Sequence, residues 1–211
     1  MKLLKKAAAV LTALSLSVCS MQTVSAAGAF GDVNGDGKLT IRDVSHIAVS
    51  ISKGRNKSLS GEADFNKDGK KDIRDAAFMA NYISKKPTFN EMLRQINKVR
   101  SKAGASPLTL DDKMCAAAML RAQETAGLFS HTRPDNTECF TVFKQFGISY
   151  GYAGENIAAG SKDVSGTMQQ WINSQGHYEN MINKSFTRLG VGMSSSPTSY
   201  YKYYWTQLFS S

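Results

Sequence analysis

The chain has 211 residues, which is enough for one or two domains of ordinary size. Its formal net charge is +9, and because residues 1–26 hold three lysines and no acid, the remainder carries +6, with both signs interspersed. This distribution lacks the stripe of Lys and Arg with interleaved aromatic residues that is typical of nucleic-acid binding. We therefore expect no nucleic-acid partner.

Residues 1–26 have the pattern of a signal peptide. Lysines precede an apolar run over residues 7–18, and the small residues Val24-Ser25-Ala26 follow it. The run is shorter than the roughly 20 apolar residues that a membrane-spanning helix needs. We predict cleavage after Ala26, a secreted extracellular protein and no membrane span. The alternatives are an uncleaved membrane anchor and lipid attachment at Cys19.

One twelve-residue pattern occurs twice, at residues 32–43 and 64–75. Both copies carry oxygen-bearing side chains at positions 1, 3, 5, 9 and 12, and a glycine at position 6, where calcium loops turn sharply. Position 7 would contribute its backbone carbonyl. We predict one Ca2+ in each loop, so two in all; the alternative is a pair of metal-free Asx-rich turns. The predicted ligands are Asp32, Asn34, Asp36, Lys38, Thr40, Asp43, Asp64, Asn66, Asp68, Lys70, Asp72 and Asp75.

Each loop is followed by an apolar helix face, at residues 44–51 and 76–83, and the first loop has no room for a helix entering it. Two such loop–helix units resemble the type I dockerin module of cellulosomes, over residues 30–86. The resemblance implies a small all-α calcium-binding module, which we place at residues 27–87, that binds a cohesin domain of a scaffoldin in polysaccharide catabolism. It also implies that positions 10 and 11 of each loop contact the cohesin, in two orientations because the two pairs are identical. These residues are Ile41, Arg42, Ile73 and Arg74.

Residues 88–211 predict a second domain of mixed helix and strand. We expect a hinge at Lys85-Lys86-Pro87, because proline disfavours helix at the preceding residue. Thr88 and Glu91 form a capping-box pattern for a helix that ends near Gly104. Further helices are expected over residues 111–124 and 164–174, and strands over 189–193 and 200–209. Helices around a small antiparallel sheet make an α+β fold.

Several motifs follow one another in residues 90–211. They are residues 93–107, 121–124, 130–135, 154–157, 171–182 and 204–209. In this order they resemble the bacterial CAP superfamily, also called the SCP domain. The resemblance implies an α-β-α sandwich with a central cleft lined by His131, Glu155 and His177, with Glu179 as an additional candidate.

Two departures from the family pattern concern metal binding in this cleft. Eukaryotic relatives often place a Glu where this chain has Ser174, and a late His where it has Tyr204-Trp205. Two imidazoles and a carboxylate still suit a divalent metal, an acid–base pair or a hydrogen-bond network. We expect at most weak metal binding there.

The cleft lacks the motifs of the common hydrolases. The sequence contains neither a His-Glu-x-x-His motif nor a Gly-x-Ser-x-Gly elbow. We therefore expect a binding or interaction module for a cell-wall, lipid or peptide ligand rather than an enzyme. The alternatives are a hydrolase of peptide or polysaccharide, and a protective or inhibitory cargo without chemistry.

Cysteines and tyrosines leave two further expectations. Cys115 lies in an Ala-rich run and is expected in the core. The sequence does not decide whether Cys115 forms a disulfide with Cys139. In the last strand, tyrosines are expected to alternate, half packed inward and half available to stack on sugar or peptide. They are Tyr200, Tyr201, Tyr203 and Tyr204.

Overall fold

The computed structural model describes residues 29–211, so the predicted signal peptide, residues 1–26, lies outside the described residues. The elements are α1 (Ile41–Ser52), η1 (Asn56–Ser58), η2 (Gly61–Ala63), α2 (Ile73–Lys102), β1 (Thr109–Leu110), α3 (Asp112–Gly127), α4 (Thr141–Gln145), β2 (Ala153–Ala159), α5 (Val164–Ile172), α6 (Gln175–Ile182), β3 (Arg188–Ser195) and β4 (Tyr203–Ser210). Within residues 29–211, no helix combines the length and the apolar character that crossing a bilayer requires.

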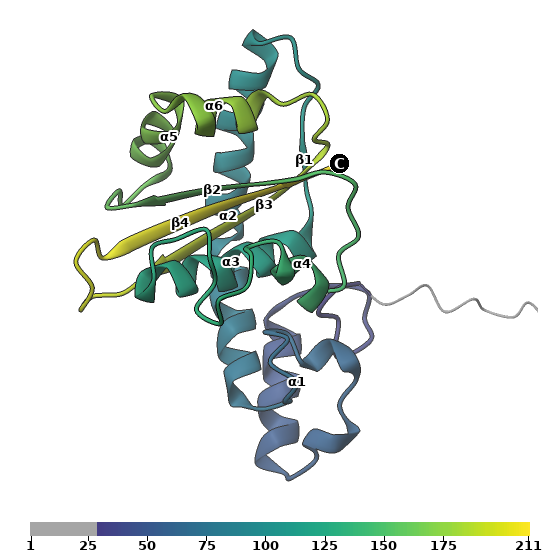
Figure 1. Cartoon of the computed structure of the whole chain (residues 1–211). Coiled ribbons are helices and arrows are strands. Elements are labelled where there is room, and N and C mark those ends of the chain that lie inside the picture. Colours follow the sequence, from purple (N-terminus) through teal and green to yellow (C-terminus); the bar gives the residue numbers. More distant parts are fainter. Residues whose placement is uncertain (1–28) are drawn as a thin grey trace, which may run out of the picture.

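A four-stranded sheet in the order β1-β3-β4-β2 forms the middle layer of the C-terminal part. Strand β4 is antiparallel to both β3 and β2, while the short β1 is parallel to β3. Helices α5 and α6 lie on one side of the sheet, and α3 and α4 lie on the other (Figure 1). This arrangement confirms the predicted α-β-α sandwich.

Helix α3 lies against β3 because two glycines leave room for it. A Cβ atom at Gly190 would lie 2.3 Å from the carbonyl oxygen of Met114, and one at Gly192 would lie 2.0 Å from that of Ala118. Only residues without a side chain tolerate so close an approach of two backbones. The contact fixes the position of α3, and with it that of Arg121, three residues after Ala118.

The N-terminal part contains the two predicted loop–helix units, α1 and the first half of α2. At the start of α1, the Thr40 hydroxyl accepts the N–H of Arg42 (3.2 Å) and the Asp43 carboxylate accepts the N–H of Thr40 (2.8 Å). Asp72 and Asp75 form the same reciprocal capping box at the start of α2. Each calcium-loop pattern therefore ends in a helix cap.

Helix α2 runs without a break through Pro87. The predicted hinge is therefore wrong, and Thr88 and Glu91 lie inside the helix rather than at the start of a new one. Pro87 has no N–H to donate to the preceding turn, which weakens a helix locally. Tertiary packing offsets this loss, because Tyr82 and Phe89 are buried on either side of the proline, with ring centroids 5.9 Å apart. One helix thus joins the two parts of the chain (Figure 1).

The last strand begins three residues later than expected, at Tyr203. Tyr200 and Tyr201 lie in the preceding turn and are exposed. The predicted alternation therefore applies only to Tyr203 and Tyr204, of which Tyr204 is buried. The expectation that exposed tyrosines stack on a ligand therefore concerns Tyr200 and Tyr201.

Candidate functional site

The side chain of Glu155 is almost entirely buried, in the middle of strand β2. The guanidinium of Arg121, on α3, binds it with two donors: Nε reaches Oε2 at 2.8 Å and Nη2 reaches Oε1 at 3.2 Å. The Arg121 side chain is itself fully buried. A buried charge needs a partner of opposite charge, and Arg121 and Glu155 supply that partner to each other.

His131 shares the same carboxylate. Its Nδ1 lies 2.8 Å from Oε1 of Glu155, and its ring is more than half exposed. An ionised carboxylate only accepts hydrogen bonds, so Nδ1 carries the proton. Burial would raise the pKa of Glu155, but the hydrogen bonds from His131 and Arg121 and the charge of Arg121 hold it below its ordinary value.

The Arg–Glu–His cluster, Arg121, Glu155 and His131, continues into two partly buried ion pairs that share Glu124. Arg121 Nη1 donates to Glu124 (2.6 Å), and Glu124 also accepts from Arg133 Nη2 (2.6 Å). The sequence did not predict Arg121, Glu124 and Arg133 as members of the site. The motif 121–124 contains the signal, because Arg and Glu three residues apart share one helix face.

His177 and Glu179 do not join this network in the same way. The backbone carbonyl of His177 accepts from the buried Asn156 (3.0 Å). Burial lowers the pKa of the His177 imidazole, and the charge of His131 lowers it further. Glu179 is exposed and accepts from Gln175 (2.9 Å) on its own helix. The structure thus brings His131 and Glu155 together, places His177 nearby and leaves Glu179 outside.

Outside the two calcium-type loops, residues 29–211 contain one group of possible metal ligands. Ligand atoms of His131, Cys139 and Glu155 lie within 4.8 Å of one another. The donors do not fit a resident metal, because Arg121 and His131 already occupy both oxygens of Glu155. Burial also raises the pKa of the Cys139 thiol to about 12, which keeps it protonated at neutral pH. Weak metal binding stays a prediction.

The two cysteines of residues 29–211, Cys115 and Cys139, are free and buried. Cys115 packs in α3, and its sulfur accepts the N–H of Val191 at 3.4 Å. The disulfide that the sequence left open is therefore not formed. Both thiols contribute to packing, and burial raises the pKa of Cys115 to about 12.

In the first loop, backbone N–H groups turn toward the carboxylates predicted to bind calcium. Asp32 accepts the N–H groups of Gly35 (2.8 Å) and Gly37 (2.8 Å), which curls the loop around its carboxylate. The fully buried Asp43 accepts the N–H of Val33 (2.9 Å) from the far end of the loop. The loop thus closes on itself around inward-facing oxygens, as calcium binding requires.

The second loop shows the same fit more directly. The buried Oδ1 atom of Asp64 has no hydrogen-bond partner among residues 29–211. Burial raises the pKa of Asp75, and the charge of Asp64 raises it further. An unpaired buried oxygen and crowded carboxylates are unfavourable without a cation. The residues present therefore fit Ca2+, which would supply the missing positive charge.

The four predicted cohesin contacts are exposed but not equivalent. Ile41 is 59% exposed and Ile73 is 57% exposed. Arg74 Nη2 forms ion pairs with Asp72 (2.6 Å) and Asp68 (3.0 Å), both of them predicted calcium ligands. Arg42 forms no ion pair with any residue of 29–211.

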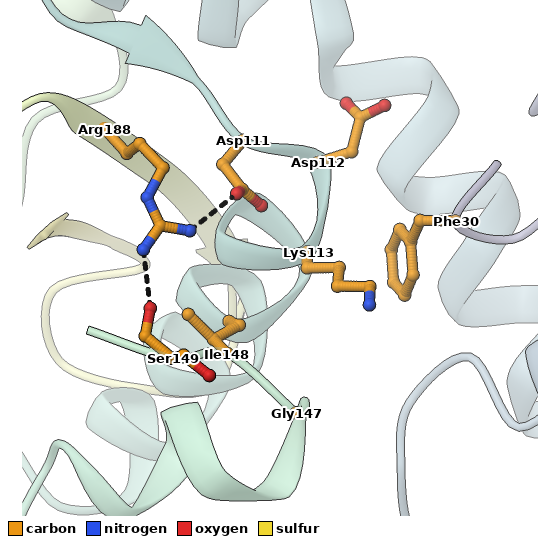
Figure 2. A pocket seen from close by; sticks show the side chains of 8 residues that line it. All are labelled: Phe30, Asp111, Asp112, Lys113, Gly147, Ile148, Ser149 and Arg188. Carbon is orange, nitrogen blue, oxygen red and sulfur yellow. Dashed lines mark hydrogen bonds and ion pairs between the residues drawn. The ribbon is translucent and has the colours of Figure 1, made fainter. Parts of the chain in front are cut away.

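A cavity of about 510 Å³ lies away from the Arg–Glu–His cluster, where Phe30 approaches the start of α3 (Figure 2). Arg188 and Asp111, two of the charged residues that line it, are already paired. Arg188 binds Asp111 (3.2 Å) and the carbonyl of Ser149 (2.6 Å), and Asp111 also caps α3 through the N–H of Met114. We assign this cavity a structural role at the junction of the two parts.

The sandwich with its buried Arg–Glu–His cluster and the paired calcium-type loops define two known classes of domain. Residues 93–209 match the model of the cysteine-rich secretory protein family, CAP, and residues 30–84 match that of the dockerin type I domain. The chain therefore belongs to the CAP family and carries a type I dockerin domain.

Two curated relatives come from Bacillus subtilis (strain 168). YkwD is 38% identical over 115 residues, which cover 54% of this chain and 43% of YkwD. YlbC, described as a membrane protein, is 28% identical over 105 residues, which cover 49% of this chain and 30% of YlbC. The chain thus spans less than half the length of either relative.

Two solved structures are similar to more than half of this chain. An outer surface protein from Borrelia burgdorferi has a TM-score of 0.54 and 20% identity, covering 60% of this chain and 93% of that one. An extracellular SCP-domain protein from Bacillus anthracis str. Ames is 32% identical, with a TM-score of 0.49, covering 57% of this chain and 40% of that one.

Proposed function

We propose that the protein is secreted, binds two Ca2+ ions through residues 30–86 and docks onto a cohesin domain of a scaffoldin in a cellulosome-type assembly. The CAP domain is then presented there as a binding or interaction module. The loop geometry carries this proposal: two copies of one ligand set curl around inward-facing carboxylates, and Asp64 retains an unpaired buried oxygen. Dockerin domains in general bind calcium and cohesins, and Ile41 and Ile73 are exposed for such a contact.

Secretion is supported by two observations. Residues 1–26 have the charged, apolar and small-residue segments of a signal peptide. The match to the dockerin type I domain points the same way, because a cellulosome-type assembly acts on polysaccharide outside the cell. An extracellular site also suits Ca2+ loops, since that ion is abundant outside cells.

The contacts of Glu155 and His131 support ligand binding over catalysis. A general base must come within hydrogen-bond reach of its substrate. Glu155 is buried and both of its oxygens are engaged, so it holds His131 in place instead of meeting a ligand. The alternative is a hydrolase of peptide or polysaccharide, which would use the exposed ring of His131 as its acid or base. A hydrolysis screen with His131→Ala as the control decides it: turnover that depends on His131 would overturn the binding assignment.

Calorimetric titration of the secreted chain, residues 27–211, with a panel of cohesins tests docking. We expect saturable binding in Ca2+ and none in chelator. The double variant Asp32→Ala/Asp64→Ala should lose binding, because each change removes the first ligand of a loop. Glu179→Gln, on the exposed face of α6, should bind like the parent. Binding that persists in chelator, or no binding to any cohesin, would contradict the proposal.

A further inference from the structure

We propose that the cavity beside His177, walled by Phe129 and Tyr201, is a subsite for an uncharged pyranose ring of a glycan chain. This inference rests on the proposed role of the CAP domain as a binding module and names the class of its ligand. The cavity measures about 280 Å³ and lies between the loop after α3, strand β2, and helices α5 and α6.

Exposed aromatic rings gather at the mouth of the cavity. Phe129 and Tyr201, which line it, are each about half exposed, and Tyr200, which contacts Tyr201 but does not line the cavity, is 90% exposed. The ring centroids of Phe129 and Tyr201 lie 6.2 Å apart, and those of Tyr200 and Tyr201 lie 4.9 Å apart. Rings at a cavity mouth can cover the apolar face of a flat ligand at little entropic cost, because an aromatic side chain has only two rotatable bonds.

The buried Tyr204 supports this aromatic wall from below. Its ring centroid lies 6.4 Å from that of Phe129 and 6.4 Å from that of Tyr201. Both exposed rings therefore rest on a residue of strand β4. The wall is part of the fold and is held in place before any ligand arrives.

The polar groups of the cavity are all uncharged. Gln170, Ser174 and His177 line it, and no Asp, Glu, Lys or Arg of residues 29–211 does. The lowered pKa of His177 keeps its imidazole neutral at pH 7, so each of the three side chains can both donate and accept. Hydroxyl groups have the same dual character. A neutral sugar therefore matches the lining, whereas a charged ligand would lack a counter-charge.

The edge of the sheet is closed to a peptide strand. Strand β2 is an edge strand, and a peptide could join it only through free backbone groups. Side chains from α5 and α6 already bind its carbonyls: Trp171 binds that of Ile157 (3.2 Å), and Asn180 binds that of Glu155 (3.4 Å). Gln170 reaches the carbonyl of Ala159 (3.4 Å) in the same manner. We therefore favour a glycan over an extended peptide.

The test uses the secreted chain and three neutral oligosaccharides, cellohexaose, xylohexaose and chitohexaose, titrated by calorimetry in Ca2+. We expect saturable binding of at least one of them, weakened at least about tenfold by Tyr201→Ala. Tyr201→Phe, which keeps the ring, should bind within about twofold of the parent. Tyr152→Ala is the matched control, since Tyr152 is also exposed but lies at the opposite end of β2.

Two variants test glycan binding and cohesin docking independently of each other. Tyr201→Ala should still bind a cohesin, and Arg42→Ala/Arg74→Ala should still bind the oligosaccharide. No saturable binding of any of the three at millimolar concentration would overturn the inference. Equal losses in Tyr201→Ala and Tyr152→Ala, or preferred binding of peptides from a mixed library that competes at this cavity, would overturn it as well.

Discussion

The Nδ1 atom of His131 lies 2.8 Å from Oε1 of Glu155, although 24 residues separate them along the chain. Arg121 binds the same carboxylate, with its Nε donating to Oε2 at 2.8 Å. The exposed imidazole is thereby held by a buried ion pair. The hydrogen bond to Glu155 fixes the position of the His131 ring.

Glu155→Gln should destabilise the protein strongly. The variant leaves the fully buried guanidinium of Arg121 without a full counter-charge at this position, and breaking a buried pair typically costs about 3–5 kcal/mol. Glu179→Gln, at an exposed position on α6, should change stability by less than about 0.5 kcal/mol. Urea denaturation of both variants at pH 7 measures the difference. Equal midpoints would show that the ion pair contributes nothing to stability.

The same carboxylate should make stability depend on pH. The pKa of Glu155 in the folded protein lies below its ordinary value of 4.5. Its contribution is therefore fully present above the unfolded-state pKa and is lost as the pH falls through the lower folded-state pKa. Unfolding free energies measured from pH 6 downward should fall less steeply in Glu155→Gln than in the parent. Parallel curves for the two proteins would refute this assignment.

Removing calcium should unfold the N-terminal units and spare the sandwich. Inward-facing carboxylates repel one another without the cation, and metal binding supplies much of the folding free energy of so small a core. Hydrogen exchange with and without chelator should show lost protection in α1 and in the first half of α2. The strands β2 to β4 should keep theirs. Unchanged protection of α1 in chelator would contradict the prediction.

Arg74→Ala should raise the calcium affinity of the second loop. The Arg74 guanidinium holds the carboxylates of Asp68 and Asp72, so it competes with the ion for its ligands. Arg42→Ala is the control, because Arg42 pairs with neither Asp36 nor Asp32 and the corresponding cap, Thr40, is neutral. Calcium titration followed by calorimetry compares the two. An increase of similar size in both variants would point to general charge effects instead.

Cohesin binding should survive the loss of either Ile-Arg pair alone. If the two loops offer alternative contact faces, Arg42→Ala or Arg74→Ala leaves the other face intact. The double variant has no intact face and should bind at least about tenfold more weakly than either single variant. Calorimetric titration against one cohesin compares the three variants. A severe loss from one single variant would mean that docking uses one fixed orientation.

Gly192→Ala should be severely destabilising, because the added Cβ would lie 2.0 Å from the carbonyl oxygen of Ala118. The backbones of α3 and β3 would have to separate, and overpacking of this kind costs about 1–3 kcal/mol or more. Gly176→Ala, in α6, meets open space and should be neutral or slightly stabilising. Thermal melts of the two variants check this. A Gly192→Ala melt like that of the parent would show that α3 can shift freely.

Sequence alone was sufficient for the features that contiguous residues encode. A calcium loop places its ligands at fixed positions within twelve residues, and Thr40 or Asp72 caps the helix that follows, so spacing predicts the geometry. The starts of α1 and α3 follow in the same way from local hydrogen bonds, the latter from Asp111.

Long-range packing decided the rest. Local rules predict a break at Pro87, yet the buried rings of Tyr82 and Phe89 keep α2 continuous. Strand β2 escapes prediction because it is covered on both faces and therefore shows no alternation of polar and apolar residues. Resemblance named His131 and Glu155, but the pairing of Glu155 with Arg121 and the aromatic wall beside His177 arise only where α3, β2 and β4 meet. No local spacing encodes such contacts, because burial among distant segments determines which charges must pair and which rings stay exposed.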